Sequence, residues 1–333
     1  MTVAIDVSLL VCTRNRRAAL THLLDSLSDA LAAAAGLTIE IVIVDNGSDD
    51  DTVALVERWR RDRPAPVVLL HEPRPGLARA RNRALAAARG AIIALTDDDC
   101  RVERDYFTAL TACFAEQRGP AVIGGRILPG DPRDLPVTLK TEDHPMIAAP
   151  STFPGGFVMG ANLAMSAAVP ARVGDFDERF GAGAPFVAAE DTDFLFRAMR
   201  RGIPVRYDPR FTVRHFHGRR APEEEISLLA GYSFGDGALY AKHIFRDRRV
   251  ATFLWKDVKD LVCDVRDPVT VHRGIARFYR FRLRHKCRGM IAYAGAACRR
   301  ALRRSPAAWR TQRARYLIPT PWRSRPTRSR PDP

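Results

Sequence analysis

Short apolar segments alternate with helix-like segments over the first hundred residues, and this alternation constrains the fold more than any other feature of the chain. The apolar segments are residues 7–12, 39–44, 67–70 and 91–95. Each has the length of a strand, and leucines or alanines at helical spacing occupy the stretches between them. Apolar strands that alternate with helices predict a parallel sheet covered on both faces. We therefore expect an α/β fold of the kind that binds nucleotides.

Polar residues directly follow three of the four apolar segments. Thr13, Arg14 and Asn15 come after the first segment, Asp45 comes after the second, and the run 97–99 comes after the fourth. In a sheet of this kind, ligands bind at the carboxyl ends of the strands. We therefore expect these three polar clusters, which are distant in sequence, to meet at one edge of the sheet.

Asp97, Asp98 and Asp99 are three adjacent carboxylates at the end of an apolar segment. In an extended chain alternate side chains share a face, so Asp97 and Asp99 would point together and Asp98 away from them. Two hard oxygen ligands on one side suit Mg²⁺ or Mn²⁺, which complete their shell with waters and substrate phosphates. The alternative is an exposed acidic turn that caps the next helix.

Two further residues of the first half are candidates for the nucleotide. Asp45 could accept a hydrogen bond from a base imide or a ribose hydroxyl, or it could form an Asx turn at the start of the next helix. Arg79, Arg81 and Arg83 alternate near the start of a helix, and one of them, for which we choose Arg81, could face the cleft. A guanidinium group there would suit phosphate oxygens.

Glu190 and Asp191 begin a helix-like segment in the second half of the chain. One of these carboxylates could serve as general base on an acceptor hydroxyl, whereas the simpler reading is that acidic residues favour the positive end of a helix dipole. His215 and His217 follow an apolar segment two residues apart, so a strand would place both rings on one side. His215 could complete a metal shell with Asp99, or it could be structural.

The ordered set of motifs resembles the inverting glycosyltransferases of family 2, which have the nucleotide-diphospho-sugar transferase (GT-A) fold. The matching segments are Thr13-Arg14-Asn15, residues 43–48, Gly76 with Ala80-Arg81-Asn82, Asp97-Asp98-Asp99, Gly160-Ala161-Asn162, and residues 173–178, 190–194 and 209–215. They span residues 7–217 in the order usual for that family. One departure is Thr96, where the family commonly carries an apolar residue.

The resemblance implies roles for individual residues. Asp99 would bind Mn²⁺ or Mg²⁺ on the donor diphosphate together with His215, Asp191 would deprotonate the acceptor hydroxyl, and Glu190 would support that base. The implied contacts to the nucleotide-sugar are Thr13, Arg14, Asn15, Asp45, Arg81, Asp97, Asp98, Gly160 and Asn162. The implied reaction moves a sugar from a nucleotide-diphosphate donor to a glycan or glycolipid acceptor, as in the synthesis of cell-envelope polysaccharides.

The same resemblance suggests how the chain is divided. We expect a GT-A catalytic domain with a mixed, mostly parallel sheet flanked by helices, followed by a helical basic extension. The boundaries are 1–220 for the catalytic domain (1–120 nucleotide-binding half, 121–220 acceptor half), 221–310 for the extension and 311–333 for a disordered basic tail. Within the acceptor half we expect strands at 157–166 and two short strands near Val205 and Val213.

Charge is unevenly distributed along the chain. The formal net charge is +15, yet residues 271–333 alone hold 18 Lys and Arg against one acidic residue, Asp332. Such a region could contact nucleic acid or an anionic membrane surface, or simply be solvated, and we prefer the membrane because glycolipid acceptors lie there. No stretch approaches 18 apolar residues and no signal peptide is evident, so we expect a cytoplasmic protein that could be peripheral on the inner face of the membrane. Six scattered cysteines argue against zinc sites and disulfides.

Three other functions remain as alternatives. An NAD-type oxidoreductase should show a GxGxxG turn after its first strand, and Thr13, Arg14 and Asn15 stand there instead. A metal-dependent phosphoryl hydrolase could use the acidic run, but it would leave the Glu190 and Asp191 pair without a hydroxyl to serve. The third alternative is a non-catalytic protein that binds nucleic acid or membrane through its basic region, with nucleic acid the less expected partner.

Overall fold

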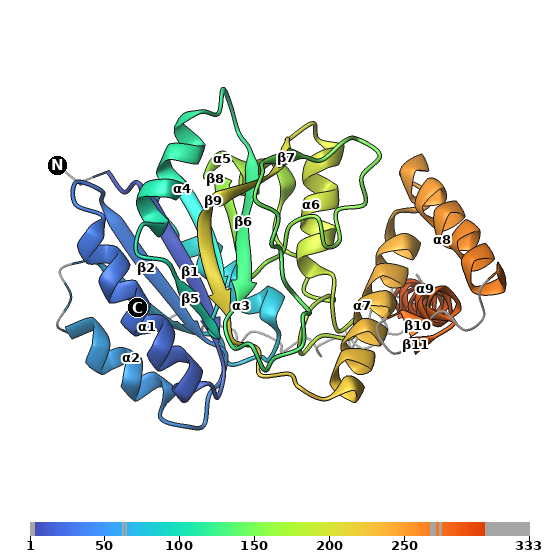
Figure 1. Ribbon diagram of the computed structural model, residues 1–333, viewed down its shortest axis with the longest axis horizontal. Helices are drawn as coiled ribbons and strands as arrows, with labels where there is room; N and C mark the ends of the chain where they lie inside the picture. Colours follow the sequence, from blue (N-terminus) through green and yellow to red (C-terminus); the bar gives the residue numbers. More distant parts are fainter. Residues whose placement is uncertain (1–3, 62, 64, 267–270, 273–274, 304–333) are drawn as a thin grey trace, which may run out of the picture.

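The computed structural model describes residues 4–303 except 62, 64, 267–270 and 273–274. Its main sheet runs in the order β3-β2-β1-β4-β8-β6-β9-β5, and β7 pairs with β9 (Figure 1). The expected tail at 311–333 lies outside the described residues.

The first half of the sheet is parallel, as the alternation predicts. Its strands are β1 (Val7–Thr13), β2 (Ile39–Asp45), β3 (Val67–His71) and β4 (Ile92–Asp97). Neighbouring strands in this half all pair in parallel, and Thr13 aligns with Asp45 while Cys12 aligns with Asp97. The carboxyl ends of β1, β2 and β4 therefore lie at one edge, which brings the three polar clusters together.

The second half of the sheet contains antiparallel pairs. Its strands are β5 (Cys100–Val102), β6 (Val122–Pro129), β7 (Met146–Ile147), β8 (Asn162–Ser166) and β9 (Val205–His215). β8 runs antiparallel to both β4 and β6, so the sheet is mixed. The two short strands expected near Val205 and Val213 are one long strand, β9, whose pairing with β6 shifts register between Gly124 and Arg126.

Helices cover both faces of the sheet. One face packs on α1 (Arg17–Ala33), α2 (Thr52–Arg61) and α4 (Tyr106–Ala115), and the other on α3 (Leu77–Ala87), α5 (Ala168–Val173) and α6 (Glu190–Arg200). Within β1, Leu9 belongs to the first cluster and Leu10 to the second, because successive side chains of a strand point to opposite faces.

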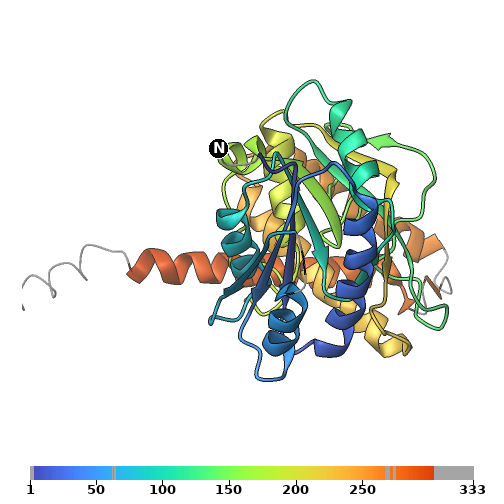
Figure 2. The same ribbon diagram turned by 90° about the vertical axis from the view of Figure 1, so that its left-hand side faces the viewer.

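Three helices lie at one end of the molecule, at the right in Figure 1. They are α7 (Pro222–His243), α8 (Arg248–Arg266) and α9 (Phe278–Arg303), and a short hairpin of β10 (Val271–His272) and β11 (Ile275–Ala276) precedes α9. The carboxyl-terminal part of α9 projects beyond the rest of the molecule (Figure 2). Among the described residues, none of the helices combines the length and apolar character needed to span a bilayer.

Two glycines allow α7 and α9 to cross closely. A Cβ atom on Gly237 would collide with the backbone carbonyl of Lys286, and one on Gly289 would collide with that of Phe234. Lys286 is 2% exposed, and its Nζ lies 2.7 Å from both carboxylate oxygens of Asp257 in α8. The three helices are therefore held together by a backbone contact and a buried ion pair.

Candidate active site

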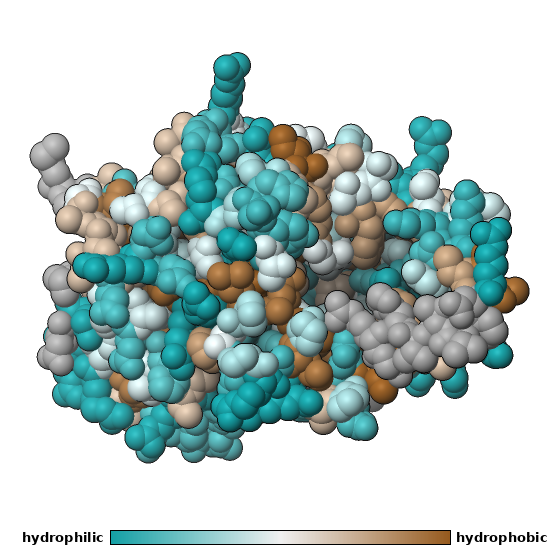
Figure 3. Space-filling model, in the orientation of Figure 1, coloured by the Kyte–Doolittle hydropathy of each residue, from teal (hydrophilic) through white to brown (hydrophobic). Residues whose placement is uncertain are grey.

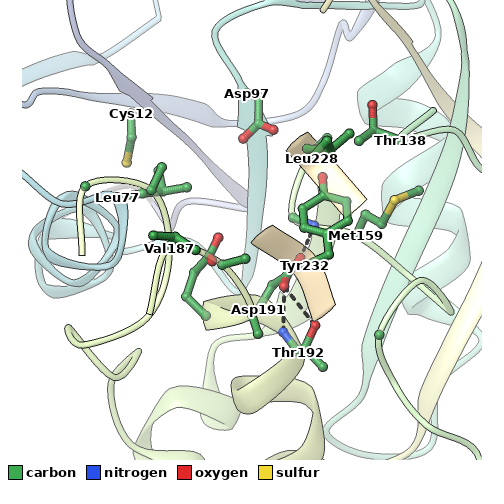
Figure 4. Close-up of a pocket in the computed structure, with 18 of the residues that line it drawn as sticks. Cys12, Leu77, Asp97, Thr138, Met159, Val187, Asp191, Thr192, Leu228 and Tyr232 are labelled. Carbon is green, nitrogen blue, oxygen red and sulfur yellow. Dashed lines mark hydrogen bonds between the residues drawn. The ribbon is translucent and has the colours of Figure 1, made fainter. Parts of the chain in front are cut away.

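A cavity of about 770 Å³ opens at the carboxyl ends of β1 and β4. Its walls come from these strand ends, from α3, from the start of α6, and from α7 and α9 (Figure 4). In the orientation of Figure 1 most of the surface is hydrophilic, and hydrophobic side chains gather towards the middle of this face (Figure 3). The cavity brings together most of the residues that the sequence proposes for the site, namely Thr13, Arg14, Arg81, Asp97, Asp98, Asp99, Gly160, Glu190, Asp191 and His215.

Each of the three adjacent carboxylates has a partner in the cavity, and Asp98 and Asp99 share Arg16. Oδ2 of Asp98 accepts a hydrogen bond from Oγ1 of Thr13 over 2.8 Å, whereas Oδ1 of Asp97 lies 3.3 Å from Nη2 of Arg81. Asp99 contacts Arg16 over 2.9 Å. Strand alternation predicts that Asp97 and Asp99 point together, but it is Asp98 and Asp99 that share a partner, because β4 ends at Asp97 and the next two residues form a turn.

His215 joins the acidic run from β9, the strand beside β5. Its Nε2 lies 3.2 Å from Oδ1 of Asp99, and both side chains are less than a tenth exposed. Burial alone would raise the pKa of Asp99, but the hydrogen bond and charge of His215, with Arg16, lower it below its ordinary value. Burial alone would lower the pKa of His215. The hydrogen bond and the charge of Asp99 oppose this effect, and the pKa is raised above its ordinary value.

The donor set around Asp99 fits a divalent cation. Ligand atoms of Asp99, Cys100 and His215 lie within 4.8 Å of one another. Burial raises the pKa of Cys100 well above its ordinary value, so the thiol stays protonated and is a poor ligand. A carboxylate and an imidazole beside an open cavity leave positions for phosphate oxygens and water, which suits Mn²⁺ or Mg²⁺.

Arg81 connects the acidic run to the start of α6. Its side chain is 4% exposed, and its Nη1 lies 2.8 Å from Oε1 of Glu190 while Nη2 faces Asp97. Burial and the neighbouring Asp191 raise the pKa of Glu190 to about 7 despite this contact. A Cβ atom on Gly160 would lie 2.5 Å from Nη2 of Arg81, so only glycine leaves room for the guanidinium group.

Asp191 is held in the cavity by two backbone amides. The amide of Gly160 donates to Oδ2 over 2.9 Å, and the amide of Thr192 donates to Oδ1 over 2.6 Å. The residue before Glu190, Ala189, has the left-handed backbone conformation with a φ of 70°. The turn into α6 therefore fixes the carboxylate at the cavity wall.

Three of the proposed residues lie outside the cavity lining, and two of them, Asp45 at the end of β2 and Asn15 after β1, contact loops. Asp45 is 1% exposed and accepts a hydrogen bond from the amide of Ser48, and Nδ1 of His71 lies 2.8 Å from its Oδ2. Asn15 accepts a hydrogen bond from the amide of Asp49 over 2.8 Å. Both side chains thus stabilise the loops that follow β1 and β2, and their contact with the nucleotide stays a prediction.

Asn162 is the third, and its side chain does not face a donor sugar as the resemblance implies. It is fully buried in β8, where Oδ1 accepts from the hydroxyl of Tyr106 over 3.0 Å. Its Nδ2 donates to the carbonyls of Arg126 and Phe211. The physical reason is that this side chain lies on the face of β8 that packs towards α4, where the Tyr106 hydroxyl and two backbone carbonyls satisfy the amide.

Sequence reasoning missed the contribution of α7 and α9. The residues that these helices add to the cavity wall are Leu228, Leu229, Tyr232, Ser233, Asp236, Phe278 and Arg282. Burial raises the pKa of Asp236 to about 6, although Lys286 and Arg282 partly oppose the rise. The sequence feature that could have indicated this contribution is a carboxylate between two glycines, Gly235 and Gly237, inside a helical segment.

Residues 8–161 match the family described as glycosyl transferase family 2. This segment, which lies in the first half of the chain, is similar to that family. The pre-mycofactocin glycosyltransferase of Mycobacterium tuberculosis is 25% identical over 254 residues, which is 72% of this chain and 48% of that protein. The chain thus spans about half the length of this curated relative. The succinoglycan biosynthesis protein ExoM of Rhizobium meliloti is 28% identical over 246 residues, which is 72% of this chain and 75% of that protein.

A solved structure shares the fold. Mannosyltransferase PcManGT from Pyrobaculum calidifontis, in complex with GDP-Man and Mn²⁺, matches with a TM-score of 0.55 and 19% identity, over 96% of this chain and 82% of that chain. The mixed, mostly parallel sheet flanked by helices is therefore a GT-A fold, as the sequence resemblance implies. The family match ends at Ala161, so α6 with Glu190 and Asp191 lies beyond it.

Proposed function

We propose that this chain moves a sugar from a nucleotide-diphosphate donor to an acceptor hydroxyl with inversion at the anomeric carbon. The single observation that carries the proposal is that one cavity holds both carboxylate groups, the run that ends β4 and the pair that begins α6, joined through Arg81. The first group suits a diphosphate with its cation, and the second suits a hydroxyl that must lose a proton.

The residues divide the reaction between them. Asp191 accepts the proton of the acceptor hydroxyl while the acceptor oxygen forms a bond to the anomeric carbon and the bond to the nucleotide diphosphate breaks. The amides of Gly160 and Thr192 keep its carboxylate oriented during this step. Glu190 supports the base through its ion pair with Arg81. The nucleotide diphosphate is contacted by Thr13, Arg14 and Asp97.

The cation proposal rests on Asp99 and His215. These two residues would hold Mn²⁺ or Mg²⁺, and the bound ion would neutralise charge that builds on the leaving diphosphate. The PcManGT structure is a complex with GDP-Man and Mn²⁺. This supports the same class of cofactor and donor for the present chain, for which Asp45 and Asn15 remain proposed contacts to the nucleotide.

The experiment that tests this function is a thermal-shift panel of UDP-, GDP- and dTDP-sugars with and without Mn²⁺. We expect one donor to raise the Tm only when the metal is present, and Asp99→Ala to abolish that rise while its circular dichroism spectrum is unchanged. Asp51→Ala, at a side chain that is 72% exposed, should behave as the wild type. NMR of the product should show the inverted anomer. Phosphate release from simple monoesters without sugar transfer would instead indicate a hydrolase and would overturn the proposal.

We also propose that the helical extension rests on an anionic membrane surface, where a glycolipid or nascent cell-envelope polysaccharide would be met. One face of α8 exposes Trp255, Val258, Val262 and Val265, at spacings of three and four residues. Asp257 is turned inward to Lys286, and Asp264 accepts hydrogen bonds from the backbone at the start of α9. Two of the three acidic residues of α8 are thus engaged with α9, and the exposed face keeps its apolar side chains beside the exposed Lys256 and Lys259.

A further inference from the structure

Asp236 is a buried carboxylate of the cavity wall to which the proposed reaction gives no role. It lies on α7 and is 7% exposed. Its nearest cations are Arg282, at 3.6 Å, and Lys286, at 4.0 Å, which are beyond the length of a hydrogen bond. Among the described residues, no group donates a hydrogen bond to this carboxylate. A buried carboxylate without such donors is costly, so its presence here requires an explanation.

Lys286 cannot satisfy Asp236, because its own donors are engaged elsewhere. An ammonium group has three N–H donors. Nζ of Lys286 lies 2.7 Å from both carboxylate oxygens of Asp257 and 3.1 Å from the hydroxyl of Tyr240. These contacts use all three donors. Lys286 therefore acts on Asp236 through its charge and not through a hydrogen bond.

Two glycines fix the position of Asp236 in the wall. A Cβ atom on Gly235 would lie 2.9 Å from the carbonyl carbon of Ala188, in the loop before α6. A Cβ atom on Gly237 would collide with the backbone carbonyl of Lys286 in α9. Because α7 is packed tightly on both sides of Asp236, the helix has little freedom to carry the carboxylate to another donor.

Ser233 adds a second polar group to the same face of α7. It precedes Asp236 by three residues, so the two side chains are neighbours on the helix surface. Ser233 lines the cavity and is 1% exposed. Within the part of the chain that the structure describes, its hydroxyl has no hydrogen-bond partner either. One turn of α7 thus presents a carboxylate and a hydroxyl to the cavity, and both have hydrogen-bonding capacity to spare.

The charges around Asp236 already balance. Two carboxylates, Asp236 and Asp257, lie beside two cations, Lys286 and Arg282. A metal ion or an ammonium group would add a third positive charge, whereas an anionic group would meet the carboxylate of Asp236. The site lacks hydrogen bonds and not charge. A neutral molecule that carries hydroxyl groups is therefore the ligand that suits it.

We infer that Asp236 is a specificity-determining residue that accepts hydrogen bonds from neighbouring hydroxyl groups of a neutral acceptor sugar. An ionised carboxylate has enough lone pairs to accept from two hydroxyls at once. Each hydroxyl is also an acceptor, and the hydroxyl of Ser233 and the guanidinium group of Arg282 supply donors beside it. The inference rests on the proposed function, because it concerns the molecule whose hydroxyl reaches Asp191.

The place of Asp236 in the cavity assigns it to the acceptor. The groups that suit the donor diphosphate lie at the ends of β1 and β4, whereas Asp236 and Ser233 belong to α7. Figure 4 shows Tyr232 of α7 close to Asp191, and Asp236 follows Tyr232 by about one helical turn. A sugar that lies along this part of α7 can therefore place one hydroxyl at the base and others at Asp236.

Stability separates a binding role for Asp236 from a structural one. Burial raises its pKa to about 6, so the side chain is ionised at about pH 7.5. An ionised group that is buried without hydrogen bonds destabilises the protein, so Asp236→Asn should unfold at a higher urea concentration than the wild type at this pH. A residue retained for the fold alone would show the opposite change. We expect the variant to gain stability and to lose sugar binding.

The test is an NMR titration of the full chain with simple glycosides at about pH 7.5. The neutral probes are the methyl glycosides of glucose, mannose, galactose and N-acetylglucosamine, and the anionic probes are methyl glucuronide and methyl galacturonide. We expect at least one neutral glycoside to bind, and to bind more tightly than the anionic probes. Asp236→Asn should weaken its binding about tenfold and reduce this preference, because hydrogen bonds to charged acceptors are the stronger ones. Absence of binding by every neutral glycoside, or unchanged binding by Asp236→Asn, would overturn the inference.

Two further variants locate the contact. Ser233→Ala should weaken binding of the same glycoside about threefold, since it removes one neutral hydrogen bond. Asp51→Asn is the matched control, because it removes the same charge from a side chain that is 72% exposed on α2's amino-terminal side, and it should bind as the wild type. If Asp51→Asn weakened binding as much as Asp236→Asn, the effect would be one of net charge and the inference would be wrong.

The result for Asp236 is separable from the result for the proposed function. Slow hydrolysis of a nucleotide-sugar with Mn²⁺ needs no acceptor, so Asp236→Asn should hydrolyse the donor with an unchanged KM. A raised KM for the donor would place Asp236 at the donor sugar, which would overturn this inference and leave the proposed function intact. A chain that binds neutral glycosides through Asp236 but neither binds nor hydrolyses any nucleotide-sugar would keep its sugar site, and both the proposed function and the assignment of that sugar as acceptor would fail.

Discussion

Nη1 of Arg81 lies 2.8 Å from Oε1 of Glu190, and both side chains are nearly buried, at 4% and 10% exposed. Taking two charges out of water is costly, and the cost is offset only when each charge finds good partners. Arg81 finds a second one in Asp97, at 3.3 Å. The guanidinium group thus fixes the distance between the part of the cavity that suits the donor and the part that suits the acceptor.

Removing either partner of this pair should be strongly destabilising. We expect Arg81→Met to lower the free energy of unfolding by about 3–5 kcal/mol, because it leaves Glu190 buried without its cation. Glu190→Gln should cost less, since Arg81 keeps Asp97. Urea unfolding of both single variants and the double variant gives the coupling energy. A double variant whose loss equals the sum of the single losses would show that the pair contributes no stabilising interaction.

Much of the fold was predictable because it follows from local patterns. The four apolar segments correspond to β1 to β4, because strands that are buried on both faces need continuous apolar side chains. The single long strand β9 was not predictable in this way, because Asp208, Pro209 and Arg210 interrupt its apolar pattern. Its continuity depends on pairing with β6 across a register shift, which is a tertiary contact.

Gly160 should not tolerate a side chain. Gly160→Ala would place a methyl group 2.5 Å from Nη2 of Arg81, so the guanidinium group must move away from Asp97 or Glu190. Since a small misplacement of a catalytic group is costly, we expect kcat for transfer to fall by about tenfold to a hundredfold. Gly119→Ala is the control, because nothing lies within 4 Å of the added atom, and it should keep full activity. Equal activity of the two variants would refute the steric argument.

Asp236 should make stability depend on pH in the direction opposite to that of an ordinary paired carboxylate. Burial raises its pKa in the folded protein to about 6, above the unfolded value of about 3.9. The folded state therefore binds the proton more tightly than the unfolded state does. The stabilisation that results is fully present below about pH 4 and is lost as the pH rises through 6. Between these values we expect the wild type to lose about 3 kcal/mol relative to Asp236→Asn, whose side chain stays neutral.

The measurement for Asp236 is urea unfolding of the wild type and Asp236→Asn at a series of pH values from 4 to about 7. The difference between the two proteins isolates one group, because all other titrations are shared. Asp51→Asn, at an exposed position, serves as control and should show no change of that size. A difference that stays constant over this range would mean that Asp236 is not protonated preferentially in the folded state.

The candidate site was predictable where motifs lie at strand ends, and not where helices from the end of the chain complete it. Asp97 and Asp99 could be proposed because their residue type fits the chemistry and their position follows from the alternation, whereas Asp191 was proposed from a helix start and from the family resemblance. Asn162 fitted a motif, yet its amide satisfies backbone carbonyls in the core. Leu228 and Phe278 could not be assigned, because an apolar residue in a helix gives no sign of whether it faces the core or a ligand.

The exposed face of α8 should bind anionic vesicles. We expect the chain to sediment with vesicles that contain phosphatidylglycerol, more weakly at high salt, and not with pure phosphatidylcholine. Val262→Asp should reduce this binding, since Val262 is 47% exposed on that face. Val53→Asp is the control, because Val53 is exposed on α2 in the sheet domain, and it should bind as the wild type. Full binding by Val262→Asp would exclude α8 as the membrane contact.

Gly289 should be required for the docking of α9 on α7. Through this docking it should also be required for the part of the cavity wall that the two helices form. An added Cβ atom meets the backbone carbonyl of Phe234, which cannot swing aside as a flexible side chain would, so Gly289→Ala must separate the helices. We expect a loss of about 1–3 kcal/mol in the free energy of unfolding, because the added methyl group overpacks the crossing of the two helices. Gly295→Ala, on the same helix, meets only the tip of Arg299 at 3.4 Å and should be neutral or stabilising by up to about 1 kcal/mol. If both variants unfold at the same urea concentration, the close crossing of α7 and α9 does not exist in solution, and these helices do not form a fixed wall of the cavity.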